Sequence, residues 1–207
     1  MLLLSIKIYR VPCLKKPYCL FIFSFIFGHS FAQNVAAING KSISTKEFLW
    51  AYKKSHNGSV SADFNDLQNY LNLYINFKLK VLDARLLGLD KNAVYEEEVK
   101  TYENALLSHK KNNNHKDQDF LLNEYREGVL MFNVSEQKIW NKAQNDDEAL
   151  NDFYRNNLQR YNMPLNEIRG QVIADYQQHL EENWVKGLQQ KHQIRINENE
   201  LRKLAKQ

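Results

Sequence analysis

Cysteine is nearly absent from this chain of 207 residues. Its two cysteines, Cys13 and Cys19, both lie within the first 32 residues, so the remainder has no disulfide and no thiol chemistry. Neither cysteine follows the small-residue pattern of a lipoprotein cleavage site. The absence of structural cysteine is compatible with an oxidising compartment, and it excludes catalysis by a thiol beyond residue 32.

Proline and glycine are also scarce. Beyond residue 32, Pro164 is the one proline left of three, and six of the seven glycines are scattered at expected helix ends and turns. Such sparse helix breakers are typical of long helices and do not fit a sheet built on glycine-rich turns. The sequence therefore predicts a mainly α fold.

An excess of charge of one sign is missing once the N-terminal segment is set aside. Lys7, Arg10, Lys15 and Lys16 are four of the 28 basic residues, and none of the 24 acidic residues lies in that segment. The rest of the chain therefore carries 24 residues of each sign. Because nucleic acid and anionic membrane surfaces are bound through basic patches, we expect neither as a partner.

Long apolar runs are missing too. The N-terminal run Tyr18–Phe27 has ten residues, whereas a helix that spans a bilayer needs about 20. Basic residues precede this run and small residues follow it, which is the order of a secretory signal. We predict a signal peptide at 1–32, cleaved between Ala32 and Gln33, and one exported module at 33–207 without stable membrane insertion. The alternative is an uncleaved signal that tethers the chain to a membrane.

Local signals predict a small β-structure near both ends of the exported module. Asn39-Gly40 lies between two short apolar runs and favours a two-residue hairpin turn with positive φ. Ser44 and Glu47 form a capping box that begins a helix directly after the hairpin. The alternating residues of 193–197 predict a strand, which we expect to join the hairpin.

Apolar periodicity predicts helices over most of the remaining sequence. Gly88 should end the first long helix in a left-handed conformation, and Pro164 suits the first turn of the last long helix. Gly128, Ser135 and 145–147 are expected to break the middle region into shorter pieces. The expected helices cover 64–87, 92–111, 120–132, 135–144, 146–161, 164–191 and 198–207.

The expected helix over 64–87 is apolar around more than half of its circumference, with Lys80 and Asp83 among the residues of its polar side. Lys78 and Arg85 lie within the apolar arc. An unpaired buried charge costs several kcal/mol, so each should extend to solvent or meet a carboxylate.

The last long helix, 164–191, has an apolar stripe of its own and carries Glu181 and Glu182. We expect this helix to supply much of the cover for the first long helix and to offer these two carboxylates to Lys78 and Arg85. The N-terminal and C-terminal parts of the exported chain would then form one module.

Patterns that carry bond chemistry are absent as well. His109 and His115 flank a polar stretch without zinc-type spacing, and His179 and Glu182 lie one helical turn apart without a second pair of ligands. The sequence contains no nucleophile elbow, phosphate-binding loop or dinucleotide fingerprint. We therefore expect no catalytic residue, no metal site and no cofactor.

Four blocks of the sequence are recognisable together: INGKSISTKEF, YLNLYINFKLKVLDARLLGLD, EYREGVLMFNVSEQKIWNKAQNDDEALNDFY and EIRGQVIADYQQHLEENWVKGLQQKHQIRINENELRKL. In this order they resemble the SurA-like periplasmic chaperones that carry parvulin-type peptidyl-prolyl isomerase domains. The resemblance covers about Val35–Leu204. It implies a periplasmic protein with an elongated helical chaperone module, whose N-terminal part (33–116) is completed by the C-terminal part (117–207).

The chain departs from the family between these two parts. Family members insert one or more parvulin domains there, whereas this sequence has only KNNNHKDQ. The catalytic domain therefore looks missing, and the protein is not expected to be an enzyme.

The resemblance implies an ATP-independent holdase for unfolded secreted or outer-membrane proteins. Such a chaperone needs exposed apolar surface, and the candidate client-binding residues are Trp50, Met131, Phe132 and Trp140, together with the hairpin. Alternatives are a peptidyl-prolyl cis-trans isomerase, an envelope adaptor with one fixed partner, and the remnant of an internal deletion. The sequence specifies neither the client nor the oligomeric state.

Overall fold

The structure is a computed structural model, and it describes residues 34–59, 63–108 and 115–206. All of these residues belong to one unit of mutually contacting chain, Phe31–Gln207. The predicted signal peptide and its cleavage site between Ala32 and Gln33 lie outside the described residues.

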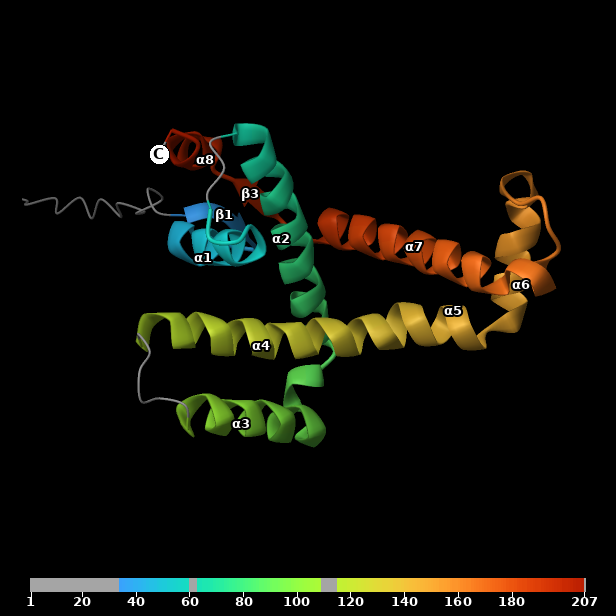
Figure 1. Ribbon diagram of the computed structural model, residues 1–207, viewed down its shortest axis with the longest axis horizontal. Helices are drawn as coiled ribbons and strands as arrows, with labels where there is room; N and C mark the ends of the chain where they lie inside the picture. Colours follow the sequence, from blue (N-terminus) through green and yellow to red (C-terminus); the bar gives the residue numbers. More distant parts are fainter. Residues whose placement is uncertain (1–33, 60–62, 109–114, 207) are drawn as a thin grey trace, which may run out of the picture. The chain divides into compact units, whose positions relative to one another are not determined.

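Helices account for most of the described chain (Figure 1), which confirms the predicted mainly α fold class. The strands are β1 (Asn34–Ile38), β2 (Lys41–Ser44) and β3 (Ile194–Ile196). The helices are α1 (Thr45–Ser55), α2 (Phe64–Leu86), α3 (Ala93–Ser108), α4 (His115–Ser135), α5 (Asn141–Asn145), α6 (Asp147–Asn156), α7 (Leu165–Lys191) and α8 (Glu198–Leu204). Three short segments complete the list: the 3₁₀ turns η2 (Leu89–Lys91) and η4 (Leu158–Arg160), and the π-helical η3 (Glu136–Trp140).

The three strands form one antiparallel sheet in the order β2-β1-β3. Asn39 and Gly40 have φ values of 50° and 81°, so the tight turn forms where it was predicted. The predicted C-terminal strand pairs with β1, which joins the two ends of the described chain. Ser44 begins α1, as predicted, because its hydroxyl accepts a hydrogen bond from the Glu47 backbone N–H at 3.1 Å.

Two of the predicted breakers in the middle region are wrong. α4 continues through Gly128, and the chain stays helical after Ser135 as the π-helical η3. Glycine costs a helix about 1 kcal/mol, but Leu130 and Val134 on the same helix are fully buried in a cluster with residues of α2 and α3. Tertiary packing therefore outweighs the local preference. The break at 145–147 is confirmed, because Asp146 caps α6.

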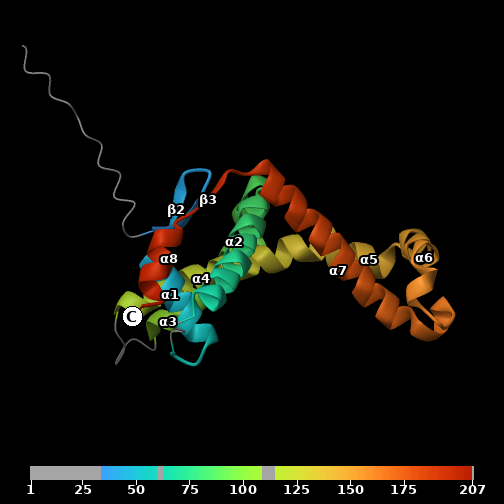
Figure 2. The same ribbon diagram turned by 90° about the horizontal axis from the view of Figure 1, so that it is seen from above.

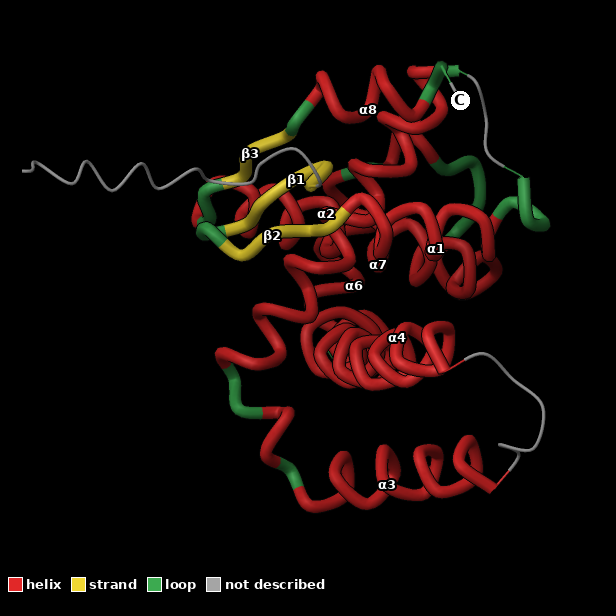
Figure 3. The backbone as a smooth tube through the Cα atoms, turned by 90° about the vertical axis from the view of Figure 1, so that its left-hand side faces the viewer, coloured by secondary structure: helices red, strands yellow, loops and turns green. Residues whose placement is uncertain are grey.

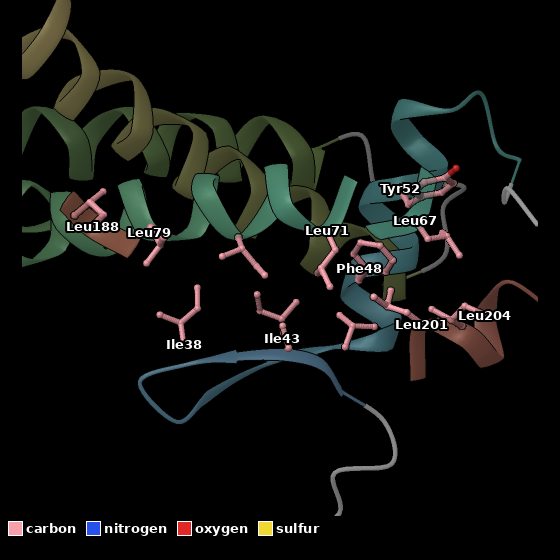
Figure 4. Close-up of a cluster of buried hydrophobic side chains, with 13 residues drawn as sticks. Ile38, Ile43, Phe48, Tyr52, Leu67, Leu71, Leu79, Leu188, Leu201 and Leu204 are labelled. Atoms are coloured by element: carbon pink, nitrogen blue, oxygen red, sulfur yellow. The ribbon is translucent and has the colours of Figure 1, made fainter. Parts of the chain in front are cut away.

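The largest hydrophobic cluster joins the hairpin, α1 and α2 to the C-terminal end of the chain. Figure 4 shows Ile38 and Ile43 projecting from the hairpin towards α2, while Leu201 and Leu204 of α8 enter the same cluster. Residues more than 100 positions apart in the sequence thus share one core. This confirms the expectation that the N-terminal and C-terminal parts pack together.

α2 is covered on several sides. α7 contributes Trp184 and Leu188, as expected, but α4 has the more extensive contacts with α2. A third cluster lies between α5, α6 and α7, beyond the part of α7 that reaches α2 (Figure 2).

The supposed polar side of α2 is partly covered as well. Asp83 is buried, where it accepts hydrogen bonds from Lys138 Nζ at 2.6 Å and Trp184 Nε1 at 2.9 Å. These donors come from η3 and α7, so Asp83 links three segments that meet at the end of α2.

Candidate functional site

An aromatic pocket of about 270 Å³ opens between α1, α2 and α4. Its aromatic rings come from all three helices. Leu73 also lines the pocket, and 66% of its surface is accessible. Trp50 stacks on Phe120 with ring centroids 5.6 Å apart. The aromatic residues that line this pocket are Trp50, Tyr70, Tyr74, Phe77 and Phe120.

A second cavity, the hairpin pocket, has about 370 Å³ and lies between the hairpin, α2 and α4. Ile38, Ile43 and Leu82 give it apolar walls, and Lys41 and Arg85 add positive charge. The two pockets adjoin, because both are lined by Glu47, Asn123 and Glu127.

A buried group of charges separates the two pockets. Lys78 Nζ lies 2.6 Å from Glu47 Oε1 and 2.5 Å from Glu127 Oε2, and Arg85 Nη2 lies 3.3 Å from Glu127 Oε1. The Glu127 side chain is only 4% exposed. Each carboxylate is therefore neutralised by a cation, as a buried charge requires.

The carboxylate partners proposed from the sequence for Lys78 and Arg85 are wrong. Glu181 pairs with Lys80 instead, and Glu182 accepts a hydrogen bond from Gln178 on its own helix. The reason is geometric: α4 lies along the apolar arc of α2, whereas α7 reaches the side of α2 that carries Lys80.

Tyr74 connects the aromatic pocket to these charges. Its hydroxyl donates a hydrogen bond to Glu47 Oε1 at 2.8 Å, and the Lys78 ammonium lies 5.3 Å from the centre of its ring. Burial raises the pKa of the Tyr74 hydroxyl well above its usual value, and the negative charge of Glu47 raises it further.

This pKa shift predicts a loss of stability in alkali. The Tyr74 hydroxyl ionises at about pH 10 in the unfolded chain but keeps its proton in the folded state, so stability is present below that pH and falls as the pH rises above it. We expect the Tyr74→Phe variant to lose less stability than the wild type between about pH 9 and about pH 11. Urea unfolding at several pH values measures how steeply the free energy of unfolding falls with pH in the wild type and in the variant. Equal slopes in the two proteins would contradict the raised pKa of Tyr74.

The four client-binding residues predicted from the sequence do not share one pocket. Trp50 lines the aromatic pocket, whereas Phe132 is 52% exposed and lines a shallow hollow beside α3 and α4. Trp140 packs edge-to-face on Phe132 with ring centroids 4.8 Å apart. Met131 is partly buried against the cluster that α4 forms with residues of α2 and α3. The hollow adjoins the aromatic pocket, since Glu124 and Gly128 line both.

Three residues that build the site were missed in the sequence: Phe120, Glu47 as an ion-pair partner, and Glu127. Phe120, Glu124 and Glu127 are spaced three or four residues apart and therefore share one face of α4. That spacing was a usable signal, but the sequence does not show that α4 packs along α2, which brings this face to the pocket.

The described side chains form no cluster of three or more potential metal ligands. His109 and the side chain of His115 lie outside the described residues, and His179 is exposed and bonds to Asn183 at 2.9 Å. None of the described helices is both long and apolar enough to cross a bilayer. The pockets offer apolar walls and paired charges, which suit non-covalent binding of extended apolar chain.

No family model, curated protein or solved structure matches the chain.

Proposed function

We propose that this protein is an ATP-independent chaperone of the cell envelope that holds unfolded polypeptides. The observation that carries the proposal is the aromatic pocket, in which five rings from three helices surround an open cavity. Such a cavity accepts apolar side chains of many shapes, because burial is non-directional and aromatic rings contact most partners favourably.

The adjoining hairpin pocket supports the same function. A client in extended conformation can place side chains in successive cavities, and the edge of a sheet offers hydrogen bonds to its backbone. The hairpin supplies such an edge beside the second cavity. The signal-like N-terminal sequence favours the periplasm as the location. The resemblance to SurA-like chaperones favours outer-membrane proteins as the clients.

Changes in the aromatic pocket are expected to weaken this activity. We expect the Trp50→Ala and Leu73→Glu variants each to suppress aggregation only at about tenfold higher concentration than the wild type. This difference corresponds to about 1.4 kcal/mol of binding free energy. Light scattering measures the aggregation of a urea-unfolded outer-membrane barrel protein on dilution without ATP.

A matched control is Leu158→Glu, because Leu158 is also an exposed leucine, at 50%, but lies in η4 outside the pocket. This variant should suppress aggregation like the wild type. Equal activity of all three variants, or no suppression by the wild type, would contradict the proposal. Acceleration of prolyl isomerisation by the wild type would favour the isomerase, and crosslinking to one stoichiometric partner would favour the adaptor.

A further inference from the structure

The hairpin pocket differs from the aromatic pocket in charge. Three cations (Lys41, Lys78 and Arg85) and two carboxylates (Glu47 and Glu127) line it, so the lining carries one positive charge in excess. The carboxylates are already paired with Lys78 and Arg85. Lys41 is exposed and has no ion pair within the described part of the chain. The unmatched charge therefore belongs to Lys41.

The pocket also borders an open strand edge. β2 is an edge strand of the sheet and lies on the side nearest α4 (Figure 3), which places its outer edge along the pocket. On β1, the Asn39 N–H and the Val35 carbonyl bond to the β3 side. Antiparallel pairing alternates, so Ala37 also bonds to the β3 side, whereas Ala36 and Ile38 bond to β2.

The register of the hairpin identifies the free backbone groups on this edge. Lys41 and Ile43 stand opposite Ile38 and Ala36 and therefore bond to β1, while Ser42 stands opposite Ala37. The N–H and C=O of Ser42 point away from β1, and they have no partner among the described residues. Ser42 is also a lining residue of the pocket.

Side-chain alternation places the charge beside the apolar walls. Ile43 projects towards α2 (Figure 4), and Lys41, two residues earlier on the same strand, projects on the same face of the sheet. The pocket thus combines an unpaired strand edge at Ser42, apolar walls at Ile38, Ile43 and Leu82, and an unmatched ammonium group at Lys41.

We propose that the hairpin pocket binds the carboxyl-terminal residue of a client chain, an inference that rests on the proposed chaperone function. The last residue of a chain presents a backbone N–H, a side chain and a carboxylate within one residue. Its backbone would pair with Ser42, an apolar side chain would enter between the apolar walls, and the carboxylate would meet Lys41. An aspartate or glutamate side chain offers the same carboxylate without the apolar group.

Three labelled octapeptides test the proposal by fluorescence anisotropy with the purified protein. One ends in leucine with a free carboxylate, the second is its amide, and the third is an amide with glutamate in place of the last leucine. We expect the free acid to bind about tenfold more tightly than either amide, the effect of one charge-assisted contact.

Two variants locate the effect. Lys41→Glu should abolish the preference for the free acid, whereas Lys53→Glu, an exposed lysine of α1 outside both pockets, should retain it. Equal binding of acid and amide, equal binding of the glutamate peptide, or the same loss in both variants would overturn the proposal. If suppression of aggregation persists without an acid preference, this inference alone fails, whereas an acid preference without suppression contradicts the chaperone function.

Discussion

Replacing Glu127 with alanine is expected to lower the free energy of unfolding by about 3 kcal/mol. The Glu127 carboxylate is buried and neutralises both Lys78 and Arg85. Lys78, whose side chain is 14% exposed, pairs with both Glu127 and Glu47. After the substitution, Glu47 is the one of these two carboxylates that remains. Breaking a buried ion pair costs more than the pair contributes, because the remaining charge has lost its counterion but not its burial. Urea unfolding followed by circular dichroism measures the loss.

A control is available three residues earlier on α4. Glu124 forms an ion pair with Lys54 in which both side chains are at least 40% exposed. Glu124→Ala should therefore change stability by no more than about 0.5 kcal/mol. If both alanine variants lose the same stability, burial does not distinguish the two pairs, and the account of the charges between the pockets is wrong.

The parts of the fold that sequence analysis predicted are those set by local chemistry. Asn39-Gly40 specifies its turn because both residues tolerate positive φ, and Ser44 begins α1 through a hydrogen bond three residues away. Gly88 adopts φ of 74° directly after the residue that caps α2, as predicted. In each case the interaction that decides the structure lies within a few residues of the chain.

The errors lie where distant residues decide. The glycine at 128 does not end α4, since its neighbours on the helix are buried against α2. Glu127 follows Lys78 by 49 positions and is its partner because α4 packs along α2. Asp83 fitted the polar side of a helical wheel, yet α7 and η3 cover it and donate hydrogen bonds to it. A wheel of one helix carries no information on which neighbour covers which side.

The candidate site was only partly predictable for the same reason. Trp50 was predicted as a candidate client-binding residue because large aromatic side chains commonly line such sites. The pocket itself forms only because α1, α2 and α4 pack together. This packing brings Phe120 of α4 against Trp50 of α1, which the sequence alone does not show. Phe132, identified by the same reasoning, lies in another hollow. Residue type therefore indicated the chemistry of the site, while its location followed from packing.

Replacing Leu201 with alanine is expected to lower the free energy of unfolding by about 3 kcal/mol. Leu201 lies in α8, has no exposed surface and belongs to the cluster that includes Phe48 of α1 and Leu71 of α2. Removing its branched side chain leaves a cavity in this shared core as well as lost burial. Leu158→Ala is the matched control, because Leu158 is 50% exposed, and should change stability by no more than about 0.5 kcal/mol.

Hydrogen exchange then separates two ways in which the Leu201→Ala variant can lose stability. If α8 and the hairpin belong to one cooperative unit, amides of β1 should exchange faster together with those of α8, because β3 and α8 both pack on β1. If only α8 exchanges faster, the C-terminal helix opens alone and does not stabilise the N-terminal part. The first result is expected, since the chain between β1 and α8 contributes β3 to the same sheet and Leu188 to the same core. Both pockets depend on this coupling, because the hairpin and α1 that line them are held against α2 by that core.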